Sequence, residues 1–192
     1  NEYSFTSSIL TDYCRLAGVA HINVQHGEKM FNIRDAFVSF DRFYVWDRYY
    51  ADMLVGMRAE DTQFIVECPV SIRGTDEPGG DITYDYVYYL GYEKKSHLIK
   101  IKDALMNLVN SGMRVCVRLH PRYSNKRLVK KIMEGIDVEE PHQCPIEKSI
   151  DRTEAAIASF STVLYQAYLR RKTVVIDDIT NEKGFLWTKD LN

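Results

Sequence analysis

Apolar positions along the chain follow two spacings, one typical of helices and one typical of strands. Between residues 96 and 110 apolar residues recur every three or four positions, which predicts an amphipathic helix. Between residues 113 and 119 the apolar run is broken only by arginines, which is typical of a buried parallel strand. The same analysis predicts helices over residues 5–17, 49–57, 96–110, 126–133 and 162–169, and strands within 19–24, 37–46, 63–66, 84–90, 113–119, 155–160 and 173–176.

Two stretches, residues 67–82 and 136–153, show neither spacing and contain prolines, so they are predicted to be irregular connections. Elsewhere strands and helices alternate. This alternation predicts an α/β fold, a Rossmann-like parallel sheet with helices on both faces. Ligands of such sheets bind where strands end and loops lead into helices. Polar residues at those positions are therefore the candidates for function.

Composition and charge narrow the class of partner. Hydrophobic residues make up 45% of the 192 residues and charged residues 27%, as in a globular protein with a core. The net charge is -2, so there is no electrostatic case for nucleic acid as a partner, because such binding requires a basic face. Two short basic runs, within residues 126–131 and 170–172, are interpreted as solvated helix faces.

The four cysteines, at positions 14, 68, 116 and 144, lack the close pairing of a metal site and the density of a disulfide scaffold. Reduced thiols, no metal and a cytoplasmic setting are therefore expected. No apolar run reaches the ~20 residues of a membrane span, and no signal peptide is recognised. The sequence begins with Asn1 directly in a helical pattern, so we expect a piece of a longer protein.

His120 directly follows the predicted strand 113–119 and precedes Pro121 and Arg122. The proline restricts the backbone at His120 to extended geometry, which holds the imidazole in one direction. There the ring can donate to a phosphate, and its protonation would help neutralise a leaving phosphate. The alternative is a capping histidine, but the position at a strand end before Pro-Arg favours the ligand site.

Ser161 and Thr162 lie between the predicted strand 155–160 and the following helix. Hydroxyls at a helix start, with free backbone N–H groups and the positive end of the dipole, can bind an anion. A plain N-cap explains the same residues equally well. Because they follow a strand, as His120 does, we expect the two groups to converge on one anion from neighbouring strands.

Weaker candidates complete the site. Glu147 lies in the segment between these two motifs and is a candidate contact of a ribose or base, although a surface acid is an equal reading. Gln25, His26 and Gly27 also follow a predicted strand, and Gly27 permits a tight turn and the close approach of a ligand across a cleft.

An aromatic cluster within residues 43–50 offers two interpretations. These side chains can stack a sugar, but aromatic residues in strands and helix faces are more often part of a core, which is the favoured reading. The residues concerned are Phe43, Tyr44, Trp46, Tyr49 and Tyr50.

The sequence Arg118-Leu119-His120-Pro121, followed about forty residues later by Phe160-Ser161-Thr162, resembles the His-Pro and Ser-Ser/Thr motifs of bacterial sialyltransferases and polysialyltransferases. A similar pair occurs in glycerol-phosphate polymerases of wall teichoic acid synthesis. These enzymes are GT-B proteins, built of two Rossmann-like halves with the active site in the cleft. The resemblance implies that residues 1–34 end the first half and cross over, and that residues 35–192 form the carboxyl-terminal, nucleotide-donor-binding half.

The resemblance also implies roles and partners. His120 would contact the donor phosphate and assist its departure, Ser161 and Thr162 would hold the same phosphate with Arg122 nearby, and Glu147 would meet the nucleoside. The donor expected is a CMP-linked sugar and the acceptor a glycan, with no cofactor. The general base normally lies in the first half, and no acidic pair followed by glycine occurs here. Peripheral association with the inner face of the membrane would come through a region outside this chain.

Two other functions stay open. A sugar-nucleotide 2-epimerase shares the two-domain architecture and would need acids and a histidine gathered for proton abstraction. A non-catalytic module would bind nucleotide or glycan without chemistry. The leading hypothesis is a glycosyltransferase of bacterial surface polysaccharide synthesis.

Overall fold

The computed structural model describes residues 6–27, 36–74 and 80–180. The chain forms two compact units, Asn1–Ile72 (unit 1) and Arg73–Asn192 (unit 2). The sequence led us to expect a boundary near residue 34, between the end of a first half and a donor-binding half, and that assignment stays a prediction. Every predicted strand and helix has a counterpart within a few residues.

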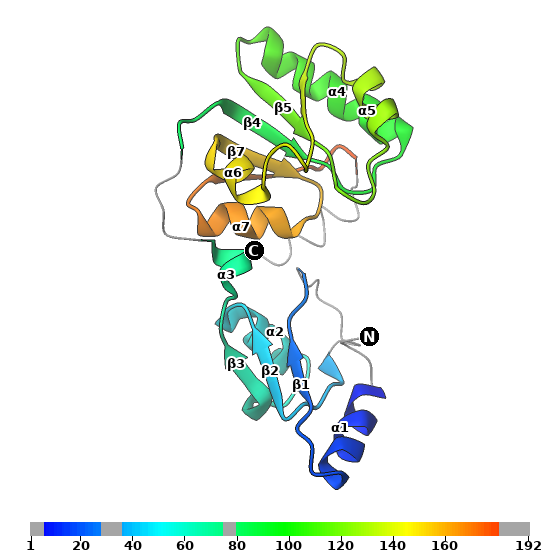
Figure 1. The fold of residues 1–192 in the computed structure, drawn as a ribbon, viewed down its shortest axis with the longest axis vertical. Helices are drawn as coiled ribbons and strands as arrows, with labels where there is room; N and C mark the ends of the chain where they lie inside the picture. The colour runs from blue at the N-terminus through cyan, green and yellow to red at the C-terminus, as the bar shows by residue number, and fades with distance from the viewer. Residues whose placement is uncertain (1–5, 28–35, 75–79, 181–192) are drawn as a thin grey trace. The chain divides into compact units, whose positions relative to one another are not determined.

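Unit 1 is built on a parallel sheet of three strands in the order β1-β2-β3 (Figure 1). Asp47 starts the helix after β2 by accepting the N–H of Tyr50 at 3.3 Å. The strands are β1 (Ile22–Val24), β2 (Arg42–Val45) and β3 (Phe64–Val66), and the helices are α1 (Thr6–Leu16), α2 (Arg48–Gly56), the 3-10 turn η2 (Asp61–Gln63) and the short α3 (Val70–Arg73), which ends at the boundary.

The aromatic cluster of unit 1 forms core. Phe43, Trp46 and Tyr50 are buried, and Trp46 packs edge-on against Tyr50 with ring centroids 5.9 Å apart. The interpretation of these three side chains as core is therefore confirmed. Tyr49, whose ring contacts that of Tyr50, is 45% exposed.

Helix α1 forms where the spacing predicts it, but its apolar stripe faces away from the unit. Its buried residues are Ser7 and Thr11, whereas Ile9, Tyr13 and Leu16 are exposed. The Thr11 hydroxyl lies 2.8 Å from Nδ1 of His21 and bonds backbone carbonyls, so polar contacts attach this helix. Periodicity predicted the helix correctly but not the face that packs.

Unit 2 is a parallel sheet of five strands in the order β6-β5-β4-β7-β8. Figure 1 shows helices on both of its faces, as the sequence predicts. The strands are β4 (Tyr84–Tyr89), β5 (Val115–Arg118), β6 (Asp137–Glu139), β7 (Thr153–Ala158) and β8 (Thr173–Ile176), and the helices are α4 (Lys95–Asn110), α5 (Lys126–Ile132), α6 (Ile146–Asp151) and α7 (Thr162–Leu169).

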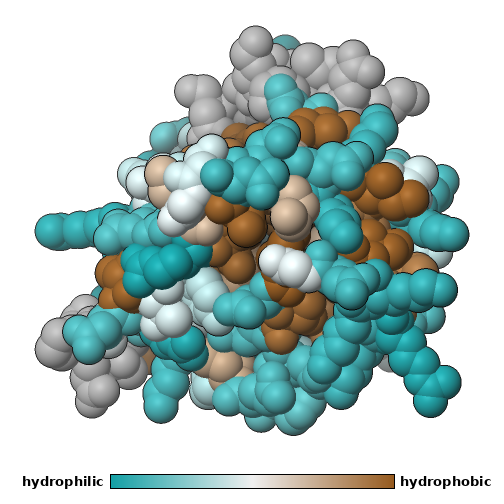
Figure 2. Space-filling view, turned by 90° about the horizontal axis from the view of Figure 1, so that it is seen from above, coloured by the Kyte–Doolittle hydropathy of each residue, from teal (hydrophilic) through white to brown (hydrophobic). Residues whose placement is uncertain are grey.

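Each face of this sheet has its own core. On one face Val115 and Val117 of β5 pack with the α4 residues Leu98 and Leu105 and with α5. On the other face Val87, Tyr89 and Cys116 pack with Ile150 of α6 and with Leu164 and Ala167 of α7. Burial raises the pKa of the Cys116 thiol to about 12, as expected of an unreactive core cysteine. The outer surface in Figure 2 is mostly hydrophilic, with hydrophobic side chains scattered between.

The prediction that residues 136–153 are irregular was wrong, because this segment contains β6 and α6. Three residues are too few to show a strand period, and β6 exists because it pairs with β5. The basic side chains of the 126–131 run are exposed, as the sequence predicts, but two of them also pair with an acid. Lys126 and Lys130 each lie 2.7 Å from the buried carboxylate of Glu140, and they lower its pKa to about 2. They thereby attach α5 to the loop after β6.

A buried ion pair connects β5 to β6. The Arg118 guanidinium bonds the carboxylate of Glu139, and its Nη2 also donates to the carbonyl of Cys144 at 2.8 Å. The Arg118 and Glu139 side chains are 6% and 11% exposed. One guanidinium thus holds two strands and the segment that leads into α6.

Replacing Arg118 with Met is expected to lower the free energy of unfolding by about 3–5 kcal/mol, because Glu139 then stays buried without its partner. The double variant Arg118→Met/Glu139→Met is expected to recover most of this loss. Urea unfolding followed by circular dichroism measures both.

Arg114→Met is the matched control, since Arg114 is 55% exposed and pairs with Asp85 near the surface. Such a pair contributes about 1 kcal/mol or less. Equal losses for Arg114→Met and Arg118→Met would contradict the role given to the buried pair.

Candidate functional site

The candidate site lies at the carboxyl edge of the unit 2 sheet. The chain runs outward from β4 to β5 and β6, then returns to the other side of β4 as β7 and β8. Loops after β5 and β7 therefore lead to helices on opposite faces of the sheet, with the end of β4 between them. In open parallel sheets this change of direction is the usual place for a ligand.

His120 stands at this edge, two residues after β5 ends. Its Nδ1 accepts the backbone N–H of Arg122 at 3.0 Å and of Tyr123 at 3.2 Å. The backbone N–H of His120 donates to Oγ of Ser124 at 2.8 Å. The imidazole ring stacks on the ring of Tyr123 with centroids 4.5 Å apart. The imidazole is therefore fixed in direction, as Pro121 led us to expect.

These contacts determine the tautomer. A nitrogen that accepts two N–H groups carries no proton, so the neutral ring has its proton on Nε2. Partial burial, and then the charge of Arg122, lower the pKa of His120 below its ordinary value. The geometry thus favours donation to a ligand through Nε2–H.

Ser161 is the N-cap of α7, and its Oγ accepts the N–H of Val163 at 3.2 Å. The N-cap interpretation is therefore correct, but it does not exclude an anion, because a hydroxyl that accepts one bond keeps its proton to donate. Thr162 is the first residue of α7, where backbone N–H groups and the helix dipole favour negative charge.

The His120 and Ser161 loops share the carboxyl edge, but they do not follow neighbouring strands as expected. β4 lies between β5 and β7, which places these loops about 10 Å apart, twice the usual spacing between strands. The two groups therefore flank the end of β4, and a shared anion would lie over that strand.

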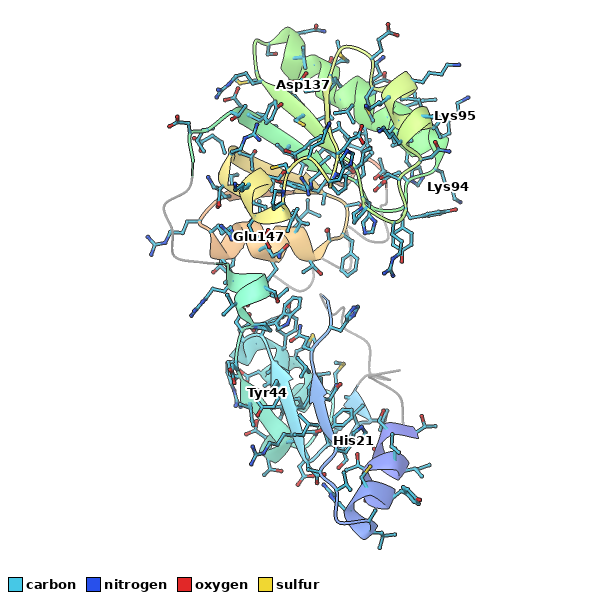
Figure 3. All side chains as sticks on the ribbon, viewed as in Figure 1. His21, Tyr44, Lys94, Lys95, Asp137 and Glu147 are labelled. Atoms are coloured by element: carbon cyan, nitrogen blue, oxygen red, sulfur yellow. The ribbon has the colours of Figure 1, made fainter. Side chains whose placement is uncertain are left out.

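The remaining sequence candidates are placed as follows. Arg122 is exposed on the turn beside His120. Glu147 is partly buried in the first turn of α6, on the face that also carries α7 (Figure 3). An acid in a first turn is also stabilised by the helix dipole, so its position fits either interpretation.

Gln25, His26 and Gly27 belong to unit 1. Gln25 is buried, and its side chain accepts the N–H of Trp46 at 3.0 Å and donates to the carbonyl of Gly27 at 3.3 Å. Gly27 has φ +71°, the conformation that favours glycine, and His26 is exposed. The amide of Gln25 thus holds strand ends together, and a role of these residues in a cleft stays a prediction.

Sequence reasoning missed the loop after β4, which occupies the centre of the edge. Glu93 accepts the N–H of Gly91 at 2.6 Å, and burial raises its pKa. The signal was present, because this loop also follows a strand. Asp177, after β8, is buried and bonds Tyr88 and the turn at Thr180, so it is structural.

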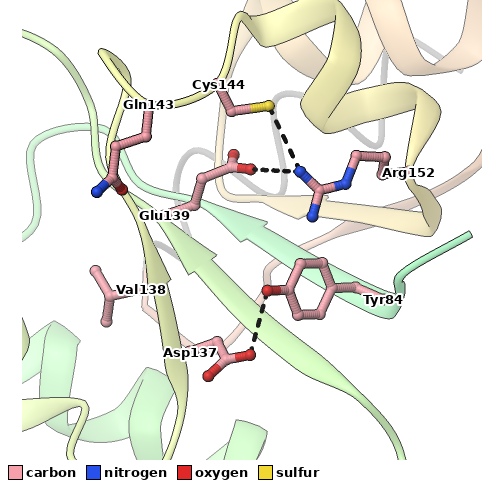
Figure 4. A pocket seen from close by; sticks show the side chains of 7 residues that line it. All are labelled: Tyr84, Asp137, Val138, Glu139, Gln143, Cys144 and Arg152. Carbon is pink, nitrogen blue, oxygen red and sulfur yellow. Dashed lines mark hydrogen bonds and ion pairs between the residues drawn. The ribbon is translucent and has the colours of Figure 1, made fainter. Parts of the chain in front are cut away.

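A polar pocket of about 350 Å³ lies elsewhere, beside β6 on the face of the sheet that carries α6 (Figure 4). Its charged groups pair with one another: Arg152 reaches Glu139 at 4.0 Å, and Tyr84 donates to Asp137 at 3.2 Å. It does not include the candidates named from sequence. Among the residues that the structure describes, no group of side chains is arranged to hold a metal, and no helix is long and apolar enough to cross a membrane.

The parallel five-stranded sheet of unit 2, with helices on both faces, has the α/β fold of GT-B domains. No protein-family model matches the chain, and no curated protein matches it.

Solved structures do match. S. aureus MnaA in complex with UDP superposes with a TM-score of 0.62 at 12% identity, over 97% of this chain and 62% of that one. The wall teichoic acid polymerase TagF gives 0.52 at 8%, over 84% and 50%. UDP-N-acetylglucosamine 2-epimerase from Rickettsia bellii gives 0.53 at 14%, over 90% and 54%.

At these identities the likeness shows the fold, and the chain spans between half and 62% of the length of these proteins. The expected GT-B-like fold is confirmed. None of the three is described as a sialyltransferase, so that finer part of the resemblance stays a prediction.

His120 is expected to titrate below its ordinary pKa of about 6.5, with Nε2 as the protonated nitrogen of the neutral ring. The folded state then binds this proton less well than the unfolded chain does. The stability that this group contributes is complete above the unfolded pKa and is lost as the pH falls through the lower, folded pKa. Nitrogen-detected NMR of the imidazole measures both properties, and Arg122→Gln is expected to raise the pKa. A neutral ring with its proton on Nδ1 would contradict the geometry.

Proposed function

We propose that unit 2 binds a nucleotide-activated sugar through its phosphate, and that the chain is part of a glycosyltransferase of bacterial surface polysaccharide synthesis. The observation that carries the proposal is the pair of donors on either side of the end of β4. These are Nε2–H of His120 and the hydroxyl at the start of α7. A location at the inner face of the membrane belongs to the same proposal.

In the proposed transfer an acceptor hydroxyl oxygen forms a bond to the anomeric carbon of the sugar and gives its proton to the general base expected in the first half. The bond between the sugar and the phosphate breaks, and the phosphate leaves with the electron pair. Negative charge grows on its oxygens, and donors already aimed at them stabilise that charge more than they stabilise the intact donor. A neutral His120 serves this purpose by hydrogen bonding from Nε2. Arg122 is exposed on the same turn and adds positive charge near the phosphate, while His120 remains the hydrogen-bond donor.

The nucleotide is the open part of the proposal. The His-Pro and Ser-Thr motifs favour a CMP-linked sugar, whereas the similar structures are of proteins described with UDP or a UDP-sugar. The shared chemistry is a phosphate joined to a pyrimidine nucleoside. Comparing CMP and UDP as ligands decides between them.

A 2-epimerase is the second candidate, because one structure of similar fold is such an enzyme. It requires carboxylates free to move a proton. At the described edge, Glu93 is engaged by the N–H of Gly91, and Asp177 is engaged by its own turn. This arrangement favours the transferase.

Ser161→Asp is expected to weaken CMP or UDP binding at least tenfold while keeping the fold. Aspartate caps a helix as well as serine does, but its charge repels a phosphate at contact distance by an amount worth a tenfold change or more. Ser161→Asn caps equally well without charge and is the matched control, with an expected change of a few-fold. Calorimetric titration measures the affinities, and thermal unfolding checks the cap. Equal nucleotide binding by both variants would leave Ser161 a cap only.

His120→Ala is expected to reduce release of free nucleotide from a nucleotide sugar by about 10²-fold, the usual cost of one lost donor to a developing charge. Binding of the nucleotide is expected to change only a few-fold. Product analysis of the same reaction separates the candidates, since a transferase releases nucleotide and an epimerase returns an isomerised nucleotide sugar. Unchanged release by His120→Ala would refute the leaving-group role.

A further inference from the structure

Two exposed tyrosines stand in contact at the carboxyl edge. Tyr92 follows β4 and Tyr123 follows β5, and their ring centroids are 6.4 Å apart with planes at 88°. They are 77% and 55% exposed. A scattered exposed aromatic residue is ordinary, but here two rings from adjacent strands meet beside His120, and core packing does not explain them.

Both rings stand on turns that side chains hold in place. The Glu93 carboxylate closes the turn that carries Tyr92 by accepting the N–H of Gly91 at 2.6 Å. The imidazole of His120 accepts the N–H of Tyr123 itself, and Ser124 accepts the N–H of His120. Because the backbone under each ring is already ordered, a ligand that stacks on them has less conformational entropy to remove.

The position of the two tyrosines limits which chemical group of a ligand can reach them. The Tyr123 ring lies 4.5 Å from the imidazole of His120, whose Nε2–H is assigned to the donor phosphate. A group that reaches the tyrosines is therefore joined to that phosphate directly or nearly so. A nucleotide sugar has two such groups, the nucleoside on one side of the phosphates and the transferred sugar on the other.

We propose that Tyr92 and Tyr123 form a stacking platform for a ring attached to the donor phosphate. This inference rests on the proposed function and deepens it. The chemistry shared by both sources is a flat ring face, the π face of a base or the C–H face of a sugar, laid against an aromatic ring. Tyr123 would thus have two functions, since its other contact orients His120.

The test is calorimetric titration of the wild-type chain and of Tyr92→Leu and Tyr123→Leu with UDP, CMP, UDP-N-acetylglucosamine and N-acetylglucosamine. Each Leu variant is expected to lose about tenfold in affinity for the nucleotide sugar, and Tyr→Phe variants at the same positions to lose little, because the ring is what stacks. Tyr168→Leu is the matched control, since Tyr168 is 68% exposed on α7. NMR of His120 checks that its tautomer survives in Tyr123→Leu.

The ligands separate the two sources of the ring. Equal losses for UDP or CMP and for the nucleotide sugar identify the nucleoside, whereas a loss confined to UDP-N-acetylglucosamine identifies the sugar. Wild-type binding that both Leu variants retain overturns the platform and leaves the proposed function standing. The absence of wild-type binding to all four ligands overturns both. A loss of the same size in Tyr168→Leu also overturns the platform.

Discussion

The pairing of Arg118 with Glu139 inside unit 2 is the interaction on which the arrangement of the site depends. One guanidinium joins the last residue of β5 to the last residue of β6 and holds the carbonyl of Cys144. His120 begins two residues after Arg118, and α6 with Glu147 begins just after Cys144. A charge placed in the core is costly unless its partners are all present, and here that requirement fixes where two candidate loops leave the sheet.

The contacts of His120 likewise hold a loop in place. Its Nδ1 stabilises the turn that follows, which leaves Nε2 as the donor facing outward. Glu93 closes the neighbouring turn through Gly91, and Glu140 anchors the next loop to α5. These two acids, to which sequence reasoning assigned no role, thus hold loops in shape. The groups left to meet a ligand are hydrogen-bond donors and aromatic rings.

Such a site suits an anion with a ring attached. The strand order places the end of β4 between the two candidate loops, and the helices after β5 and β7 leave on opposite faces. In the proposed function, neutral donors and a positive helix end would surround a phosphate without requiring a buried positive charge.

The sequence by itself determined the local structure. Periodicity predicted α4 and β5 within two residues, and the N-cap that was one of two interpretations of Ser161 is present. It also placed His120 at a strand end, because a buried strand, a histidine and a proline are consecutive and need no distant partner.

Only the tertiary structure decided what depends on distant residues. β6 is too short to show a period and forms through its pairing with β5. The strand order put β4 between the two motifs, and the buried face of α1 proved to be the polar one. The tautomer of His120 came from backbone N–H groups whose direction a turn sets. A residue pattern fixes the conformation of its own segment, whereas neighbours across the sheet and the direction of each loop arise from contacts that sequence spacing does not encode.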